Sequence, residues 1–285
     1  MKRKGLVIAL SVLALLLVPL TASATNAWSK YHWERTETDA AGELLPLRSS
    51  FGNNVWSRWD DHLGDATADW NASAILSNTV VAGAATNPTA TCTPATGNVE
   101  VCAQDYGANG WLGVAGIWIT RGKDKHITRG YVKLNDFYFD LSQYGTADWR
   151  QLVTCQEVGH IFGLAHQDES FDNANVGTCM DYTSAPVKDG IDNTQPNQHD
   201  FDQLLTIYDG HHVSDGGGDY GDGGNGGGSP PGRGNGNGNG NGNGTGADHS
   251  EFGRAIHTDP DGRPDVFELD LPNGEKLITH VTWAR

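Results

Sequence analysis

The stretch that decides the fold reads Gln156-Glu157-Val158-Gly159-His160-Ile161-Phe162-Gly163-Leu164-Ala165-His166. Residues four apart on an α-helix point the same way, so Gln156 and His160 can face one metal ion, with Glu157 beside them. His166 lies six residues beyond His160, and a straight helix would carry it round to the back. We therefore expect the helix to end near Gly163, because glycine can adopt the positive φ that turns the chain.

The spacing of these side chains is that of a catalytic zinc site. Such a site needs three protein ligands and one open position for water, and the pattern H-E-x-x-H-x-x-G-x-x-H supplies three histidines and a glutamate base. Gln156 stands at the first histidine position, and its neutral amide oxygen is a weaker ligand than imidazole. We expect Gln156, His160 and His166 to bind zinc, with Glu157 as the general base that carries a proton from water to the leaving amine.

Other residues could complete a ligand set weakened by the glutamine. Three further histidines are candidates, although no spacing links them to the motif: His62, His126 and His199. Asp168, two residues after His166, could bind the metal or support a ligand, or it could be a solvated or calcium-binding carboxylate. The sequence leaves these alternatives open.

A second motif follows the first and gives the pair a family resemblance. Glu157-x-x-His160-x-x-Gly163-x-x-His166 followed by Cys179-Met180-Asp181-Tyr182 resembles the metzincin superfamily of zinc endopeptidases, over roughly residues 30–210. The resemblance implies that Met180 lies in a turn under the metal. It also implies that Tyr182 binds zinc or stabilises the oxyanion, as in the astacin and serralysin branches. The implied fold is a twisted mixed sheet with two long helices and a substrate cleft along its edge strand.

The first 24 residues have the pattern of a secretory signal. Lys2, Arg3 and Lys4 precede an apolar run to Leu20, and small residues follow at 22–24. A membrane anchor is the alternative, but the run is short and is interrupted by Pro19. We expect an exported protein with no membrane span after cleavage.

The net charge limits the partners that the chain is expected to have. Removing the signal takes the charge from −16 to −19. An acidic surface argues against nucleic acid and anionic membranes. We expect a secreted monomer that acts on a protein or peptide substrate, and plain solubility is the alternative reason for the acidity.

Four cysteines in an exported chain favour disulfides. Cys92 and Cys102 bracket a turn-rich loop, and Cys155 and Cys179 flank the proposed metal site. We prefer these two pairings among the three that four cysteines allow, because each joins segments already expected to be neighbours. A tetrathiolate zinc site is the alternative, but no C-x-x-C spacing occurs.

Composition divides the chain into four parts. The signal occupies residues 1–24, a catalytic domain 25–213, a Gly/Asn-rich flexible linker 214–246 and a small β-hairpin segment 247–285. Within the domain we expect helices at 60–76, 147–162 and 198–208 and strands at 112–119 and 130–134. The stripe predicted to be buried on the last helix is Phe201, Leu204, Leu205 and Tyr208. Strands and helices do not alternate strictly, so the predicted fold class is α+β.

Calcium is expected as a possible structural ion beside zinc. Acidic side chains near the motif supply hard oxygen ligands but form no known loop: Asp136, Asp140, Asp168, Glu169, Asp172 and Asp181. The leading functional hypothesis is a secreted zinc-dependent endopeptidase. The alternatives are a pseudo-protease that uses the cleft as a protein- or peptide-binding module, and a structural module whose function lies in residues 247–285.

Overall fold

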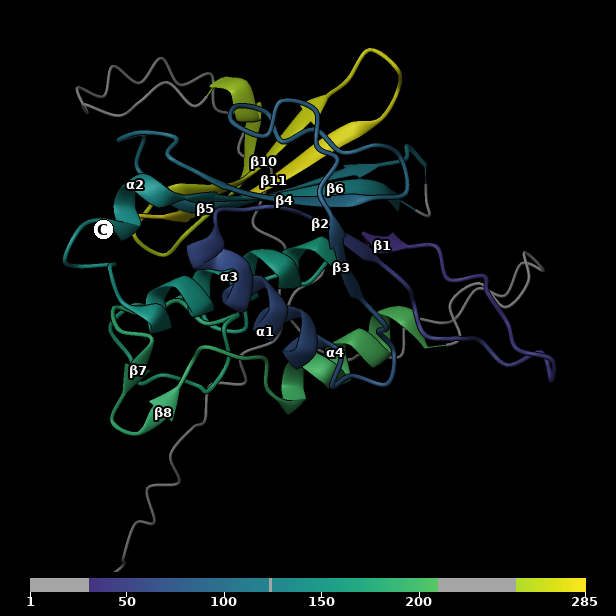
Figure 1. Cartoon of the computed structure of the whole chain (residues 1–285), viewed down its shortest axis with the longest axis horizontal. Helices are drawn as coiled ribbons and strands as arrows, with labels where there is room; N and C mark the ends of the chain where they lie inside the picture. The colour runs from purple at the N-terminus through teal and green to yellow at the C-terminus, as the bar shows by residue number, and fades with distance from the viewer. Residues whose placement is uncertain (1–30, 123–124, 210–249) are drawn as a thin grey trace, which may run out of the picture.

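The computed structural model describes residues 31–122, 125–209 and 250–285 (Figure 1). The predicted signal at 1–24 and the predicted linker at 214–246 lie outside these residues. Within the described ranges, no helix is both long and apolar enough to cross a membrane.

The fold is mixed α/β, with one large sheet and few helices. Among the described residues this sheet has nine strands, and its main path runs β3-β2-β4-β6-β5-β11-β10-β9, with β1 also paired to β6. The strands of the sheet are β1 His32–Trp33, β2 Ser50–Asn54, β3 Thr79–Ala82, β4 Val99–Gln104, β5 Trp111–Ile119, β6 His126–Asn135, β9 Arg254–Thr258, β10 Pro264–Asp270 and β11 Lys276–Trp283. A separate pair consists of β7 Val187–Lys188 and β8 Ile191–Asp192.

The sheet combines two kinds of pairing. The strands β1, β2, β3, β4 and β6 pair in parallel, whereas β5, β11, β10 and β9 continue the sheet from β6 with antiparallel pairing throughout. Parallel neighbours need crossover connections, and the helix between β2 and β3 supplies one. Antiparallel neighbours need only tight turns, such as the one between β10 and β11.

The main helices lie on one side of the sheet (Figure 1). The helices are η1 Ser57–Trp59, α1 Asp60–Trp70, α2 Asp136–Phe139, α3 Ala147–Ile161, α4 Gln198–Tyr208 and η2 Ser250–Phe252. Helix α3 packs against β5, β6 and α1. On α1 and the turn before it, Trp59, Leu63, Ala66 and Trp70 are fully buried, which is the apolar stripe that attaches the helix to the core.

Two details of the predicted helices are wrong. The first helix ends at Trp70 rather than near residue 76. The Asn71 side chain accepts a hydrogen bond from the Asn78 backbone N–H and donates one to the Asn78 carbonyl oxygen, and these two bonds fix a turn that stops the helix. On α4, Leu205 is 41% exposed, and Ile207 is buried in its place. The helix turns Leu205 to solvent because the face that meets the core is set by Leu204, Ile207 and Tyr208.

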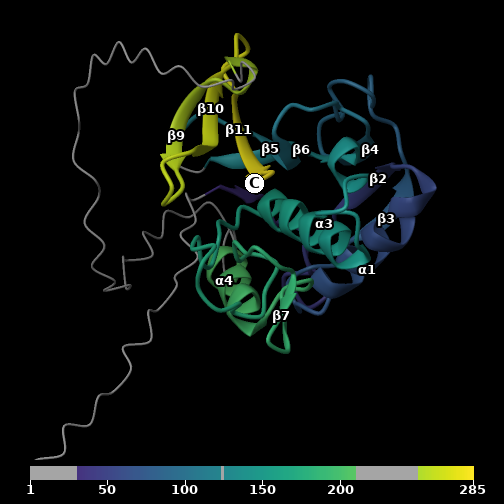
Figure 2. The same cartoon turned by 90° about the vertical axis from the view of Figure 1, so that its left-hand side faces the viewer.

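The predicted C-terminal hairpin consists of β10 and β11, paired from Val266↔His280 to Asp270↔Lys276. It does not stand alone. Strand β11 pairs with β5 over its full length, so the hairpin and β9 extend the sheet that carries α3 (Figure 2). An isolated hairpin is marginally stable in water, and here β11 is paired on both edges and its residues from Ile278 to Trp283 are all buried.

Both predicted disulfides are formed. Cys92 is bonded to Cys102, and Cys155 is bonded to Cys179. The second disulfide joins α3 to the segment that contains Met180, so it holds together the two parts of the motif.

Candidate metal centre

Helix α3 positions the motif and ends where the sequence predicts. Thr146 caps its first turn by accepting a hydrogen bond from the Trp149 N–H, and residues 152–161 are all buried. After the helix, Gly163 has φ +86°, and a Cβ there would collide with the Tyr31 carbonyl oxygen. Glycine is therefore required at this position both for the backbone conformation and for the close approach of Tyr31.

This turn brings two imidazoles together. The Nε2 atoms of His160 and His166 are 3.1 Å apart. The Nδ1 of His160 lies 2.8 Å from the Leu164 carbonyl oxygen, which can only accept, so Nδ1 carries the proton and Nε2 presents its lone pair. Two nitrogens bound to one tetrahedral zinc ion at 2.0–2.1 Å lie about 3.3 Å apart. The two histidines therefore fit a shared zinc ion with little adjustment.

Gln156 lies one turn before His160 and contacts the C-terminal strand. Its side chain is buried, and its Oε1 accepts a hydrogen bond of 2.7 Å from the Thr282 hydroxyl on β11. An amide oxygen has two lone pairs, so this bond leaves one for a second partner. The arrangement holds the amide in a fixed rotamer and is compatible with Gln156 as an oxygen ligand.

Glu157 is a buried carboxylate without a well-formed hydrogen bond to any described residue. It lies against β5, where a Cβ added at Gly113 would approach Oε1 to 2.5 Å. Burial raises the pKa of Glu157 to about 8, and the nearby Thr282 side chain and Ala115 backbone oppose this only in part. An unpaired buried carboxylate is costly, so this group fits a site that is completed by a further polar partner.

Met180 and Tyr182 both lie close to the motif. A Cβ added at Gly159 would come within 2.5 Å of the Met180 sulfur, so Met180 packs directly under α3. The Tyr182 ring lies 4.1 Å from the His166 ring between centroids. Its hydroxyl donates a 2.7 Å hydrogen bond to the Asp265 Oδ2 on β10.

Residues from the C-terminal strands complete the site, and sequence reasoning missed them. The His280 ring of β11 stacks on the His160 ring at 4.2 Å with 15° between the planes. Asp265 binds Tyr182 through one oxygen and His257 Nδ1 through the other, at 2.7 Å each. The only signal in the sequence is that His280 and Thr282 lie on one face of a predicted strand. This alternation does not identify the element that the face packs against.

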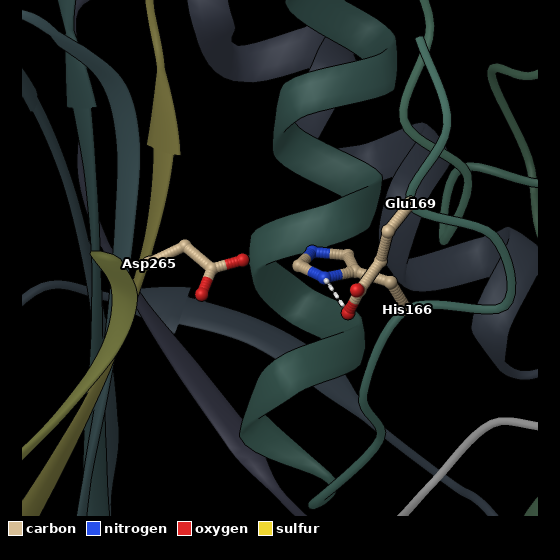
Figure 3. Close-up of side chains that lie close together, drawn as sticks. All are labelled: His166, Glu169 and Asp265. Atoms are coloured by element: carbon tan, nitrogen blue, oxygen red, sulfur yellow. Dashed lines mark ion pairs between the residues drawn. The ribbon is translucent and has the colours of Figure 1, made fainter. Parts of the chain in front are cut away.

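A second possible ligand group lies beside the motif. His166, Glu169 and Asp265 offer ligand atoms within 4.8 Å of one another (Figure 3). It is the one group of three or more His, Cys, Asp or Glu side chains this close in the described residues. Glu169 lies 3.7 Å from the His166 Nδ1 and 3.7 Å from the His257 Nε2, so its carboxylate lies between two imidazole rings.

Other sequence candidates contact protein groups away from the two histidines. His62 Nδ1 lies 3.0 Å from the Gln151 side-chain oxygen, and Asp168 accepts a hydrogen bond from the Ser170 backbone. His126 packs edge-on against His32, and the His199 backbone N–H helps cap α4. Of the acidic residues proposed for calcium, Asp136 and Asp140 both bind Arg58. The structure thus places none of these side chains as a third ligand beside His160 and His166.

A cavity of about 210 Å³ lies next to Gln156. Its walls come from β5, α3, the segment after Met180 and the C-terminal end of the chain, and they include Leu112, Trp149, Leu152, Tyr182, Trp283 and Arg285. The cavity is mainly apolar at its α3 wall and could accept a side chain of a bound peptide.

Comparisons with known proteins add little to this geometry. No protein-family model matches the chain, and no curated protein matches it. Among solved structures, a chain of the GM1-bound form of the ECX AB5 holotoxin matches with 15% identity and a TM-score of 0.30, over 57% of this chain and 80% of that chain.

Proposed function

We propose that the chain is an exported zinc-dependent endopeptidase of the metzincin type. The observation that carries the proposal is the facing pair of His160 and His166 nitrogens, 3.1 Å apart, with the unpaired carboxylate of Glu157 on the same helix. His160 stays neutral because burial and the neighbouring imidazoles lower its pKa well below the usual range, and a neutral imidazole is what a metal requires. The two disulfides fit the oxidising conditions outside the cell.

Zinc held by His160, His166 and the Gln156 oxygen would supply Lewis acidity and lower the pKa of the attacking water to about 7. Glu157 accepts a proton from this water while the water oxygen bonds to the scissile carbon. The carbon–nitrogen bond then breaks, and Glu157 delivers the proton to the leaving nitrogen. Burial raises the pKa of Glu157 in the metal-free chain, and a divalent cation beside it would lower this pKa and favour the ionised form that accepts the proton.

Tyr182 is the candidate for stabilising the oxyanion. Its hydroxyl is buried and donates to Asp265, and the nearby carboxylates together with burial raise its pKa well above the usual range. The hydroxyl therefore keeps its proton and remains a hydrogen-bond donor. To donate to a substrate oxygen it would have to leave Asp265.

A second candidate function is a peptide-binding module without hydrolysis. Two observations favour it: the first ligand position is the amide of Gln156, and that amide already binds Thr282. A site that binds zinc weakly would keep the apolar cavity but lose the chemistry. The two functions differ in zinc content and in turnover.

The proposal is tested on the purified full chain, stripped of metal and reconstituted with zinc. Bound zinc is measured by mass spectrometry, and hydrolysis is followed with a mixture of quenched fluorescent peptides. We expect close to one zinc ion per chain and cleavage that Glu157→Ala abolishes while zinc is retained. Stoichiometric zinc without cleavage, in the full chain and in the variant Ile278→Asp, would contradict the peptidase, and weak zinc binding without cleavage would favour the binding module. Less than about a tenth of an equivalent of zinc would contradict both the metal site and the peptidase.

A further inference from the structure

Strand β5 would be the edge of the sheet beside α3 if the C-terminal strands were absent. The order β3-β2-β4-β6-β5 ends at β5, and β11 is the strand that pairs with its other side. A free strand edge is a template for an extended peptide, which adds to the sheet through backbone hydrogen bonds. A peptide that reached Glu157 and His160 by this route would occupy the position of β11.

The pairing of β11 with β5 is long and regular next to the motif. The register runs from Lys276↔Ile119 to Thr282↔Gly113 without interruption. Ala115 and Gly113, the β5 residues opposite His280 and Thr282, are small, and Gly113 leaves space that Glu157 fills. The C-terminal strand therefore lies across the part of β5 that faces the catalytic residues.

Two side chains of β11 have nearly the same spacing as the two side chains of α3 that they contact. Gln156 and His160 are four residues apart on a helix, which separates them by about 6 Å along the axis. Thr282 and His280 are two apart on a strand, which separates them by about 6.7 Å. This near match lets Thr282 bond Gln156 while His280 stacks on His160.

The stacked geometry makes His280 a cover for the site. The lone pairs of an imidazole lie in the ring plane, and the two rings are within 15° of parallel at 4.2 Å. In-plane lone pairs of two such rings point side by side and do not converge on one ion at 2.0–2.1 Å. His280 is only 8% exposed, and its Nδ1 has no hydrogen-bond partner among the described side chains and backbone.

Strand β10 and the end of the chain contact Tyr182 and the residues around the cavity. Asp265 on β10 accepts from Tyr182, the candidate oxyanion donor. At the chain end, the Arg285 backbone N–H donates to the Tyr144 hydroxyl at 2.6 Å. Arg285 also lines the cavity beside Gln156. Thus β10, β11 and the end of the chain together contact the metal ligands, the oxyanion donor and the side-chain cavity.

We infer that residues 250–285 are a built-in occupant of the peptide-binding edge, and that the described conformation is a latent form of the proposed enzyme. Substrate binds along β5 only after β11 has left it. The inference rests on the proposed function, because it assigns a regulator to that same site. It predicts that the activity of the full chain is limited by release of the C-terminal hairpin.

The test compares two pairs of introduced cysteines in the full chain. Trp118→Cys/Leu277→Cys joins β11 to β5 at opposed positions, whereas Leu269→Cys/Leu277→Cys joins β11 only to β10. All three replaced side chains are partly exposed, and the pairs share one substitution. Oxidation of the first pair should lower peptide hydrolysis at least about tenfold, with recovery in mild reductant, while the second pair should change it less than about twofold.

A release variant decides the case if the wild-type rate is too low to measure. Ile278→Asp places a carboxylate at a fully buried position of β11 that pairs with Ile117 and lies outside the proposed catalytic residues. We expect this variant to bind zinc and to hydrolyse peptides at least about tenfold faster than the wild type, with loss of the gain when Glu157→Gln is added.

The outcomes separate the latency from the peptidase itself. Hydrolysis that is unaffected by oxidation of the first pair would overturn the latency. A zinc-loaded release variant that is no faster than the wild type would do the same. Absence of zinc from every form would instead contradict the proposed function, and the latency with it. If near-ultraviolet circular dichroism shows that Ile278→Asp does not fold, a synthetic peptide of residues 276–283 is added to the reduced Trp118→Cys/Leu277→Cys chain instead.

This peptide should compete with substrate for β5 and inhibit hydrolysis, and absence of inhibition would overturn the latency.

Discussion

The two sides of the site differ in how far apart in the chain their residues lie. On the α3 side, Gln156, Glu157 and His160 belong to one helix, and a single turn at Gly163 adds His166. On the β11 side, His280 and Thr282 come from a strand more than 100 residues later. The α3 side carries the side chains that we propose bind zinc, and the β11 side contacts them through one hydrogen bond and one stacked ring.

Loss of the base should have the largest effect. Glu157→Gln keeps the size of the side chain but cannot accept a proton, so we expect hydrolysis by the zinc-loaded chain to fall about 10²–10⁴-fold. Zinc content should stay near that of the wild type, because Glu157 is not a ligand. The control is Glu37→Gln, an exposed carboxylate that pairs with Arg48 and lies outside both the motif and the C-terminal hairpin, and its hydrolysis should be unchanged. Retained hydrolysis in Glu157→Gln would remove Glu157 from the mechanism.

The two histidines that stack on each other should differ in zinc affinity. His160→Ala removes a ligand and should weaken zinc binding about 10²–10³-fold, as measured by competition with a chromophoric chelator. His280→Ala removes only a cover, so its effect should be about tenfold or less. If both variants weaken binding equally, His280 is a ligand and the two sides of the site are not distinct.

The pKa of Glu157 predicts a pH-dependent stability in the metal-free protein. The pKa of Glu157 in the folded chain is about 8, above the ordinary value of 4.5. The protonated carboxyl therefore makes its full contribution to stability below about pH 4.5, and this contribution is lost as the pH rises to about 8. Glu157→Gln should therefore raise the free energy of unfolding by about 4–5 kcal/mol at pH 8.5 and change it little at pH 4.5. Urea unfolding in a chelator measures both values. An equal difference between variant and wild type at the two pH values would show that the pKa of Glu157 does not change on folding.

The hydrogen bond between the two sides should have the smallest effect. Thr282→Val removes the hydroxyl that donates to Gln156 and should lower the free energy of unfolding by about 1 kcal/mol. In a double-mutant cycle with Gln156→Met, the second substitution should cost less once the first is made, with a coupling of about 0.5–1 kcal/mol. Strict additivity would mean that the two side chains do not interact in solution.

The difference between the two sides also explains what the sequence could predict. Helix α3, the turn at Gly163 and the C-terminal hairpin follow from local patterns, because each is set by residues within about ten positions. Both disulfides followed from placing neighbouring segments together. The end of α1 was missed because residues 72–76 keep a helical apolar spacing, while the Asn71 side chain stops the helix through its bonds to Asn78.

The pairing of β11 with β5 could not be predicted in the same way. The alternating pattern of β11 shows that it is a strand, but it does not identify the partner or the register. The segment that separates the two parts, residues 214–246, is Gly- and Asn-rich and carries no pattern that fixes their arrangement. The roles of Asp265, His280 and Thr282 therefore emerge only from the folded chain.

The most direct test of the account is the position of zinc in crystals of the reconstituted full chain, located by anomalous scattering. The account predicts one ion about 2.0–2.1 Å from the Nε2 atoms of both His160 and His166, with His280 outside bonding distance. An ion bound instead by His166, Glu169 and Asp265, or one that His280 ligates, would contradict it.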